Sequence, residues 1–332
     1  MKRIAIITSG GDAPGMNAAI RAATLTAISS GCEVFGVKRG YQGLITGEIM
    51  ELTSMAVSEI LHQGGTVLHS ARSKEFQTVE GREKAAIQLR NLGVEGIIVI
   101  GGDGSFRGAR ELSNLGFATV GIPGTIDNDI QCTDLSIGFD TALNTVLDSI
   151  TKIRDTAVSH DRVYVVEVMG KNSGFIALYA ALAGGADAVL VPEIEPDLDQ
   201  VIKRIHTVNR IGRRHSIVLV AEGVYGDPLS GRSFTESAAF KVGTYLNLKV
   251  KKDIRITILG HIQRGGSPSA LDLTLGTRFG AKAVDVLLAG ENGKMVGWVD
   301  HDVQVSAMDD AIARKKQVEP EIFKLAEILA ST

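Results

Sequence analysis

The feature that most constrains this chain is a series of short aliphatic runs without polar alternation, such as Ile97-Ile98-Val99-Ile100. Strands that are buried on both faces have this pattern, and they belong to parallel sheets with helices on each side. The chain is therefore expected to contain a mainly parallel sheet. The predicted strands are Ile4–Thr8, Glu33–Val37, Gly96–Ile100, Thr119–Pro123, Val163–Val168, Ala188–Pro192, Ile217–Glu222 and Ile254–Leu259.

Helical patterns lie between these runs, and alternation of strand and helix predicts an α/β doubly wound fold. Eight or more strand–helix units are too many for one hydrophobic core, so we expect two similar lobes with a break near Ile137–Asp140. Residues 1–138 with about 263–312 would form one lobe, and 139–262 with about 313–332 the other. The predicted helices are Met16–Ser29, Arg82–Leu92, Thr141–Thr156, Leu198–Val208, Thr235–Leu246 and Arg278–Leu288.

Composition excludes several classes of protein. The formal charge is −3, from 35 basic and 38 acidic residues, which gives no electrostatic reason to expect nucleic acid as a partner. Cys32 and Cys132 lack metal or disulfide spacing and are expected to be buried thiols in a reducing compartment. The most apolar stretch, Ala177–Pro192, is interrupted by glycines and Asp187, so no membrane span is expected. These features predict a soluble, cytoplasmic protein.

Two glycine-rich segments follow predicted strands, at the sheet edge where α/β proteins bind ligands. Gly10–Gly11 and Gly101–Ser105 each precede a helical pattern, and free amides there would favour phosphate. The alternative is that the glycines only permit tight turns. Asp103 favours the phosphate interpretation, because a carboxylate among such amides requires a cation, and Mg²⁺ bridges carboxylates to nucleotide phosphates. The GxxxxGK[ST] and GxGxxG signatures are absent.

A third segment, Gly124–Asp129, carries two carboxylates. Asp127 and Asp129 would share one face if the chain were extended. Partial desolvation and mutual repulsion can raise the pKa of one carboxyl of such a pair toward the range that suits a base. An Asx-rich turn is the structural alternative. The nearby Asp103 loop favours the catalytic interpretation.

The second half supplies cations beside strand ends. Arginine recognises phosphate through two parallel hydrogen bonds. A single arginine is usually a solvated charge, but a His–Arg pair between glycines indicates an anion such as a sugar phosphate. The residues concerned are Arg162, Arg255, His261 and Arg264.

Together these segments resemble the bacterial ATP-dependent 6-phosphofructokinase family. The resemblance covers nearly the whole chain, and its most specific parts are Pro123–Asp129 and Gly260–Pro268. It implies MgATP-dependent phosphorylation of fructose 6-phosphate at the 1-hydroxyl, giving fructose 1,6-bisphosphate and ADP in glycolysis. It also implies an allosteric homotetramer of two-lobed α/β subunits, with ATP bound by the lobe that contains residue 1 and the sugar phosphate by the other. Further matching segments are Thr8–Asn17, Gly65–Arg72, Ile100–Ser105, Ile153–Thr156, Glu167–Gly170 and Ala221–Glu222.

The resemblance assigns roles by position. Asp127 would take the proton from the 1-hydroxyl, with Thr125 and Asp129 beside it, and Asp103 would serve Mg²⁺. Arg162 and Arg255 would reach the substrate of a neighbouring subunit. The implied ATP site contains Gly11, Tyr41, Arg72, Ser73, Gly102, Asp103, Gly104 and Ser105. The implied sugar-phosphate site contains Thr125, Asp127, Met169, Gly170, Lys171, Glu222, His261 and Arg264.

Two positions bear on the phosphoryl donor. Pyrophosphate-dependent relatives carry Asp and Lys where this chain has Gly104 and Gly124, so ATP is expected. A pyrophosphate-dependent phosphotransferase and a low-activity or regulatory paralogue are the alternatives. Four departures from the family pattern near the donor support the low-activity or regulatory paralogue. Lys171 replaces an arginine, Phe175 replaces an aspartate, Ser73 replaces an aromatic residue and Gln77 replaces an arginine.

The family's effector site is altered further. Basic residues of regulated members are replaced by Leu25, Ser54 and Ile211. Because each charge-assisted hydrogen bond contributes roughly 1.5–3 kcal/mol, we expect weak or absent allosteric control. The residues that still fit the effector pattern are Arg21, Arg154, Gly185, Asp187, Arg213 and His215.

Overall fold

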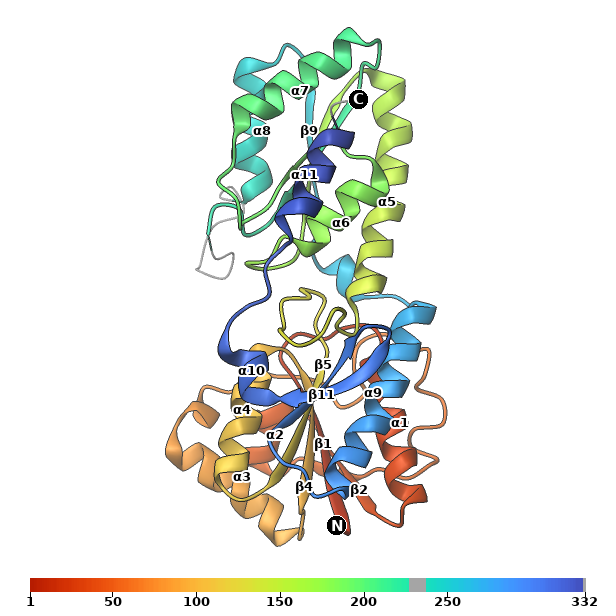
Figure 1. Cartoon of the computed structure of the whole chain (residues 1–332), viewed down its shortest axis with the longest axis vertical. Helices are drawn as coiled ribbons and strands as arrows, with labels where there is room; N and C mark the ends of the chain where they lie inside the picture. Colours follow the sequence, from red (N-terminus) through yellow and green to blue (C-terminus); the bar gives the residue numbers. More distant parts are fainter. Residues whose placement is uncertain (227–236, 331–332) are drawn as a thin grey trace. The chain divides into compact units, whose positions relative to one another are not determined.

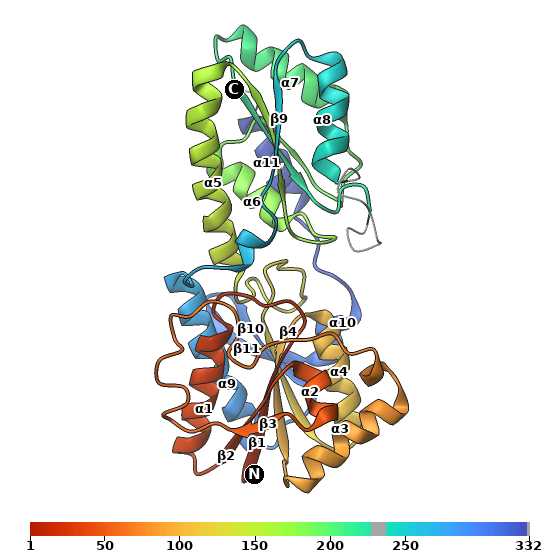
Figure 2. The ribbon, with the colours of Figure 1, turned by 180° about the vertical axis from the view of Figure 1, so that it is seen from behind.

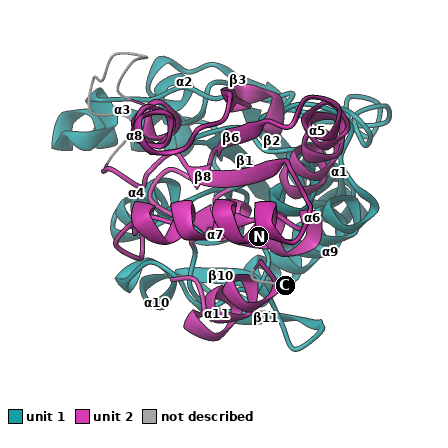
Figure 3. Ribbon diagram, turned by 90° about the horizontal axis from the view of Figure 1, so that it is seen from above, with its two compact units in different colours: residues 1–126, 130–141, 264–316 teal, residues 127–129, 142–263, 317–332 magenta. Residues whose placement is uncertain are grey.

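Two separate β-sheets organise the chain, one in each of two units (Figures 1 and 3). The computed structural model describes residues 1–226 and 237–330. The predicted lobe segments end at residues 138, 262 and about 312, and in the structure the corresponding segments end at residues 141, 263 and 316. The first unit holds Met1–Ile126, Ile130–Thr141 and Arg264–Lys316, and the second holds Asp127–Asp129, Ala142–Gln263 and Gln317–Thr332.

The first unit contains a seven-stranded sheet of order β11-β10-β5-β4-β1-β2-β3. The five inner strands run parallel, and β3 and β11 pair antiparallel at the two edges. Strands β3, β10 and β11 were not predicted, because they lack the uninterrupted aliphatic run of a buried strand. The bounds are β1 Arg3–Ser9, β2 Glu33–Val37, β3 Ile49–Glu51, β4 Gly96–Gly101, β5 Ala118–Pro123, β10 Lys294–Val299 and β11 Asp302–Ala307.

Helices cover both faces of this sheet, with α1 (Met16–Ser29) and α9 (Ala270–Leu288) on one side (Figures 1 and 2). These two helices pack closely because Gly276 and Gly280 lack side chains. A Cβ on either glycine would lie within 2.7 Å of a carbonyl oxygen of Gly15 or Ala19. The other side carries α2 Gly40–Thr46, α3 Val79–Asn91, α4 Asp103–Asn114 and α10 Met308–Ala313 (Figures 1 and 2).

The second unit contains a four-stranded, all-parallel sheet of order β7-β8-β6-β9. Its inner strands β6 (Val163–Val168) and β8 (Ser216–Ala221) are buried along their whole length, as their apolar runs predict. The outer strands are β7 (Ala188–Leu190) and β9 (Ile254–Ile258). The helices are α5 Phe139–His160, α6 Phe175–Gly184, α7 Leu198–Arg210, α8 Ala238–Lys249 and α11 Pro320–Leu329.

These observations confirm the predicted fold class of two α/β lobes with mainly parallel sheets. Several helices differ from their predicted ranges. Helix α9 begins at Ala270 rather than Arg278, because the Ser269 side chain caps it by accepting a hydrogen bond from Asp272 N. Helix α4 was expected behind the Gly101–Ser105 loop but without bounds, and no helix was predicted at α2, α6, α10 or α11. The predicted helix over Thr235–Leu246 starts outside the described residues and is seen from Ala238.

Two further expectations concern the cysteines and the apolar stretch. Both cysteines are free thiols, but only Cys32 is buried. Cys132 is half-buried with a left-handed backbone (φ 62°), so the expectation of two buried thiols is wrong for it. Within residues 1–226 and 237–330, no helix has the length and apolar character to cross a bilayer.

Candidate active site

Two predicted ligand-binding loops meet at the carboxyl ends of β4 and β5 in the first unit. Strand register pairs Gly101 with Pro123, and Gly124 N donates to the carbonyl of Gly101 at 3.0 Å. A Cβ atom on Gly102 would lie 3.8 Å from the Cβ of Thr125. The glycine loop and the start of the carboxylate segment are therefore neighbours.

The amino end of α4 forms the centre of this edge. The helix begins at Asp103, and its N-cap Gly102 provides no side-chain cap. The first-turn amides and the helix dipole favour an anion there. Asp103 is partly exposed and forms an ion pair with Arg107 at 3.1 Å. A Cβ on Gly104 would meet no atom within 4 Å, so packing within the fold does not require glycine at this position.

The loop after β1 lies beside the segment that leads to Arg72. Gly10 has a left-handed backbone (φ 88°), and its carbonyl accepts from Ser70 Oγ at 2.5 Å. Thr8 Oγ1 donates to the carbonyl of His69 at 2.8 Å. These bonds fix the chain just before Arg72, which is itself exposed. Ser73 follows, and its hydroxyl donates to Gln42 Oε1 at 2.8 Å.

Tyr41, a predicted ATP-site residue, is buried in the core of the first unit. Its ring stacks on Phe76 with centroids 4.2 Å apart, and its hydroxyl donates to the carbonyl of Ser105 at 2.6 Å. Burial raises the pKa of the Tyr41 hydroxyl, so it stays a donor. Ser105 Oγ in turn donates to the carbonyl of Ser9 at 2.9 Å. Tyr41 thus supports the α4 loop from beneath.

Arg264 contacts the Gly10–Gly11 loop, a relationship that no sequence pattern indicated. Arg264 Nη1 donates to the carbonyl of Asp12 at 2.8 Å. A Cβ on Gly11 would lie 2.7 Å from the same nitrogen. The missing side chain of Gly11 is what admits the guanidinium.

The segment around Asp127 is a turn rather than an extended chain. Ile126 and Asp127 form the turn, and Asn128 has a left-handed backbone (φ 52°), which asparagine tolerates well. The condition of an extended chain is therefore not met, and the structure has a turn here, which was the stated alternative. Thr125 belongs to the first unit, whereas Asp127 and Asp129 belong to the second. There, Ser173 Oγ donates to the carbonyl of Asp127 at 3.0 Å.

In the second unit, predicted sugar-site residues gather where β6 and β8 end. Glu222 N donates to the carbonyl of Val168 at 2.9 Å, and Lys171 N donates to Glu222 Oε1 at 2.7 Å. Gly170 and Lys171 both have positive φ angles, 139° and 56°. The chain therefore bends sharply and places Lys171 over the Glu222 carboxylate.

The 3₁₀ helix Gly260–Arg264 (η3) carries His261, which is exposed. Its Gln263 is fully buried and was not predicted as a site residue. The Gln263 amide accepts from Met169 N at 3.2 Å and donates to the carbonyl of Gly260 at 2.9 Å. Its position inside the Gly260–Pro268 motif was the only sequence signal available.

Arg162 and Arg255 both contact one carboxylate at the opposite edge of this sheet. Arg162 Nε lies 2.9 Å and Arg255 Nη2 2.7 Å from Asp253 Oδ2. Arg162 precedes β6, whereas Met169 follows it. At about 3.3 Å per residue, β6 separates these two residues by roughly 20 Å, which exceeds the reach of an arginine side chain.

The predicted effector residues are divided between the units. Arg21 lies on α1 in the first unit, and the others lie in the second. Arg213 forms an ion pair with the buried Asp187, and Arg154 donates to the carbonyls of Gly184 and Gly185. Burial raises the pKa of Asp187 and lowers that of His215, whose side chain lies in the same cluster.

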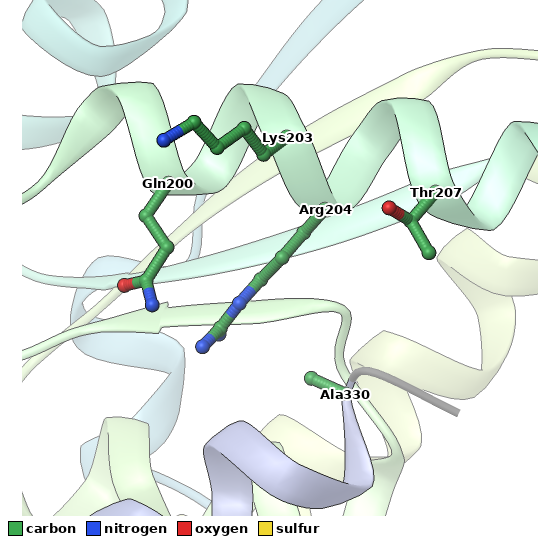
Figure 4. A pocket seen from close by; sticks show the side chains of 5 residues that line it. All are labelled: Gln200, Lys203, Arg204, Thr207 and Ala330. Carbon is green, nitrogen blue, oxygen red and sulfur yellow. The ribbon is translucent and has the colours of Figure 1, made fainter.

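A pocket elsewhere in the second unit is lined by α7 and the end of α11 (Figure 4). None of its lining residues was predicted to bind a ligand or to act in catalysis. They are Gln200, Lys203, Arg204, Thr207 and Ala330.

Comparison with known proteins shows the family to which the chain belongs. The sequence model of the Phosphofructokinase family matches residues 3–287, and the chain belongs to this family. The protein is 52% identical to the ATP-dependent 6-phosphofructokinase of Halothermothrix orenii, over 99% of this chain and 100% of that protein. It is 50% identical to the ATP-dependent 6-phosphofructokinase of Halalkalibacterium halodurans, again over 99% and 100%.

Solved structures agree on the fold. Pichia pastoris phosphofructokinase in the T-state matches 99% of this chain and 37% of its own, with a TM-score of 0.86 and 34% identity. A pyrophosphate-dependent phosphofructokinase from Marinobacter aquaeolei matches 97% of this chain and 86% of its own, with a TM-score of 0.84. At 22% identity, the latter match supports the fold alone.

Proposed function

We propose that this protein is an ATP-dependent 6-phosphofructokinase, which transfers the γ-phosphoryl group of ATP to the 1-hydroxyl of fructose 6-phosphate. The products are fructose 1,6-bisphosphate and ADP, as in glycolysis. Relatives about 50% identical over 99% of the chain carry that name. The structural observation that best supports this function is that the glycine loop before α4 adjoins Thr125, which lies two residues before Asp127. Along the chain, the proposed base therefore follows closely after a residue that adjoins the proposed phosphate-binding loop.

The chemistry follows from these residues. Asp127 accepts the proton as the 1-hydroxyl oxygen attacks phosphorus, with Thr125 and Asp129 as its flanking polar groups. The first-turn amides of α4 bind the nucleotide phosphates, and Lys171 offsets charge on the transferring group. Phosphoryl transfer depends mainly on such positioning and neutralisation, and a positioned base contributes about 10²–10⁴-fold.

The residues present suit Mg²⁺ bound together with the nucleotide. Within the described part of the chain, no group of three or more acidic, histidine or cysteine side chains could hold a metal. Asp103 stands alone in the first turn of α4, and Mg²⁺ commonly takes one carboxylate with substrate phosphates and water. The ion would neutralise phosphate charge during transfer.

Gly104 supports ATP rather than pyrophosphate as the donor. Glycine in a helix costs about 0.5–1 kcal/mol relative to alanine. The space around Gly104 is open within the fold, so packing does not explain why glycine is used despite this cost in helix stability. A bound nucleotide that occupies the space would explain it.

Arg162 and Arg255 support an oligomer with shared sites. They lie at the amino edge of the four-stranded sheet, too far along β6 to serve the Met169 end of the same subunit. They would instead complete the sugar-phosphate site of a neighbouring copy, in the homotetramer expected for this family. A cytoplasmic location stays a prediction.

One assay tests the proposal. Purified protein is mixed with fructose 6-phosphate, Mg²⁺ and either ATP or pyrophosphate, and fructose 1,6-bisphosphate is measured by coupled enzymes. We expect turnover with ATP. No product with either donor would contradict the proposed function, and a clear preference for pyrophosphate would overturn the assignment of the donor.

A further inference from the structure

We infer that Gln263 is a positioning residue that sets the fructose 6-phosphate affinity by joining the two loops of the sugar-phosphate site. The inference rests on the proposed function. It goes beyond it because Gln263 is not among the residues to which a role toward the substrates has been assigned. Its partners are backbone groups of Met169 and Gly260.

The amide of Gln263 is buried. The Gln263 side chain has 0% exposure, and both ends of its amide are hydrogen-bonded to main chain. A buried amide without partners is strongly unfavourable, and leucine or methionine would fill the same space without that cost. The two hydrogen bonds are therefore what the glutamine provides.

The bond to Met169 N lies at the end of the ladder between β6 and β9. The ladder between β6 and β9 ends where Leu259 N donates to the carbonyl of Glu167 at 3.1 Å. Met169 N lies beyond that point, where the β9 side offers no further strand residue, and Gln263 Oε1 accepts from it instead. The side chain thus extends the ladder by one bond, on the side of β6 opposite Glu222.

The bond to the Gly260 carbonyl lies in the loop that carries His261. Gly260 has a left-handed backbone (φ 52°), which begins the short η3 helix. Gln263 Nε2 donates to its carbonyl at 2.9 Å and closes this turn. One amide therefore fixes both Met169–Gly170, after β6, and His261, after β9. We expect the spacing of these loops to determine how tightly the sugar phosphate binds.

The main test is the Gln263→Met variant, which keeps the volume and removes both hydrogen bonds. We expect the KM for fructose 6-phosphate to rise about tenfold, with the KM for ATP within about twofold of wild type. Asp197→Ala is the matched control, because it removes the α7 N-cap in the same unit and lowers stability without touching either loop. An unchanged KM for fructose 6-phosphate in folded Gln263→Met would overturn the inference.

A second variant separates the two bonds. Gln263→Glu keeps the acceptor for Met169 N, and its carboxyl donates to the Gly260 carbonyl only when it is protonated. We expect the ratio of its fructose 6-phosphate KM to that of wild type to fall as the pH is lowered. A merely structural role predicts a ratio that does not vary with pH.

A third measurement does not depend on activity. Hydrogen exchange at the Met169 amide should be slow in wild type and faster in Gln263→Met, while the amides of β6 remain protected. Unchanged protection at Met169 would contradict the inference, even if Gln263→Met proved too unstable for kinetics. If wild-type protein does not phosphorylate fructose 6-phosphate, the proposed function is wrong. The exchange rate at Met169 would then still show whether Gln263 holds the Met169 loop.

Discussion

The guanidinium of Arg264 occupies the space that a side chain on Gly11 would take. A Cβ at Gly11 would lie 2.7 Å from Arg264 Nη1 and 3.0 Å from its Cζ. Sequence resemblance assigns Gly11 to the nucleotide and Arg264 to the sugar phosphate. Their contact in the first unit means that one substitution should affect both substrates.

Gly11→Ala tests this coupling. No left-handed φ forces glycine here, so alanine is tolerated by the backbone and displaces the flexible Arg264 side chain. We expect the KM for fructose 6-phosphate to rise about 3- to 10-fold, in addition to any change for ATP. In an Arg264→Ala background, Gly11→Ala should leave the fructose 6-phosphate KM unaltered. Additive effects in this double-mutant cycle would disprove the coupling.

Asp127→Ser tests the assignment of the base. Loss of a positioned base should lower kcat by at least about 10²-fold, while equilibrium binding of both substrates persists. Asp309→Asn is a suitable control, because this exposed carboxylate pairs only with Arg110 at 3.5 Å in the region described. Full turnover by Asp127→Ser in steady-state kinetics would remove Asp127 from the mechanism.

Gly104→Asp tests the assignment of the donor. The position is open, so the fold should tolerate the change, and an acidic residue in the first turn of α4 is favourable for the helix. We expect activity with ATP to fall more than tenfold without a loss of thermal stability. Gly104→Ala should have a smaller effect, since it adds one methyl group and no charge. Equal ATP kinetics for Gly104→Asp and wild type would show that this space does not hold the nucleotide.

The buried strands and the loops after them could be predicted from the sequence, because uninterrupted aliphatic runs and the glycines that follow them are local signals. β6 matches its predicted range from Val163 to Val168, for example. The sequence did not reveal that Gly11 accommodates Arg264, since that contact joins residues 253 positions apart in the chain. It left an extended chain and a turn both open at Asp127, because local sequence cannot separate an extended Asp-Asn-Asp from one with a left-handed Asn128. Asp253 was missed because an exposed acid next to Lys252 has no distinctive pattern.

Asp272 should make the stability of the first unit depend on pH. The side chain is fully buried and accepts from Gly138 N at 2.7 Å and Thr141 N at 2.8 Å. Burial raises the pKa of its carboxyl from 3.8 to about 6. Between those values the folded state holds the proton and the unfolded state has released it, so stability falls as the pH rises.

The Asp272→Asn variant isolates this contribution. Relative to the variant, wild type should lose about 2 kcal/mol of unfolding free energy between pH 4.5 and 7.5. The single tryptophan, Trp298 on β10, reports denaturant unfolding of the same unit by fluorescence. Asp309→Asn should show no such drift relative to wild type. A constant gap between wild type and Asp272→Asn would contradict the raised pKa.

Weak allosteric control is expected from the predicted effector residues of the second unit. Arg213 is paired with Asp187, and Arg154 donates to the carbonyls of Gly184 and Gly185, so a phosphate effector must compete with internal partners. Ile211, where regulated members carry a basic residue, is 60% exposed. We expect ADP and phosphoenolpyruvate each to shift the half-saturating fructose 6-phosphate concentration by less than about twofold, because each missing charge-assisted hydrogen bond weakens effector binding about tenfold or more.

Ile211→Lys restores one cation at an exposed position and should increase the response to both effectors. Ile194→Lys adds the same charge to the same unit, at a position that is also exposed but does not belong to the effector pattern, and should not increase the response. Initial rates across a fructose 6-phosphate series, with and without each effector, provide the comparison. Strongly sigmoidal wild-type kinetics that ADP converts to a hyperbola would show that Arg154 and Arg213 bind effectors well despite their internal partners.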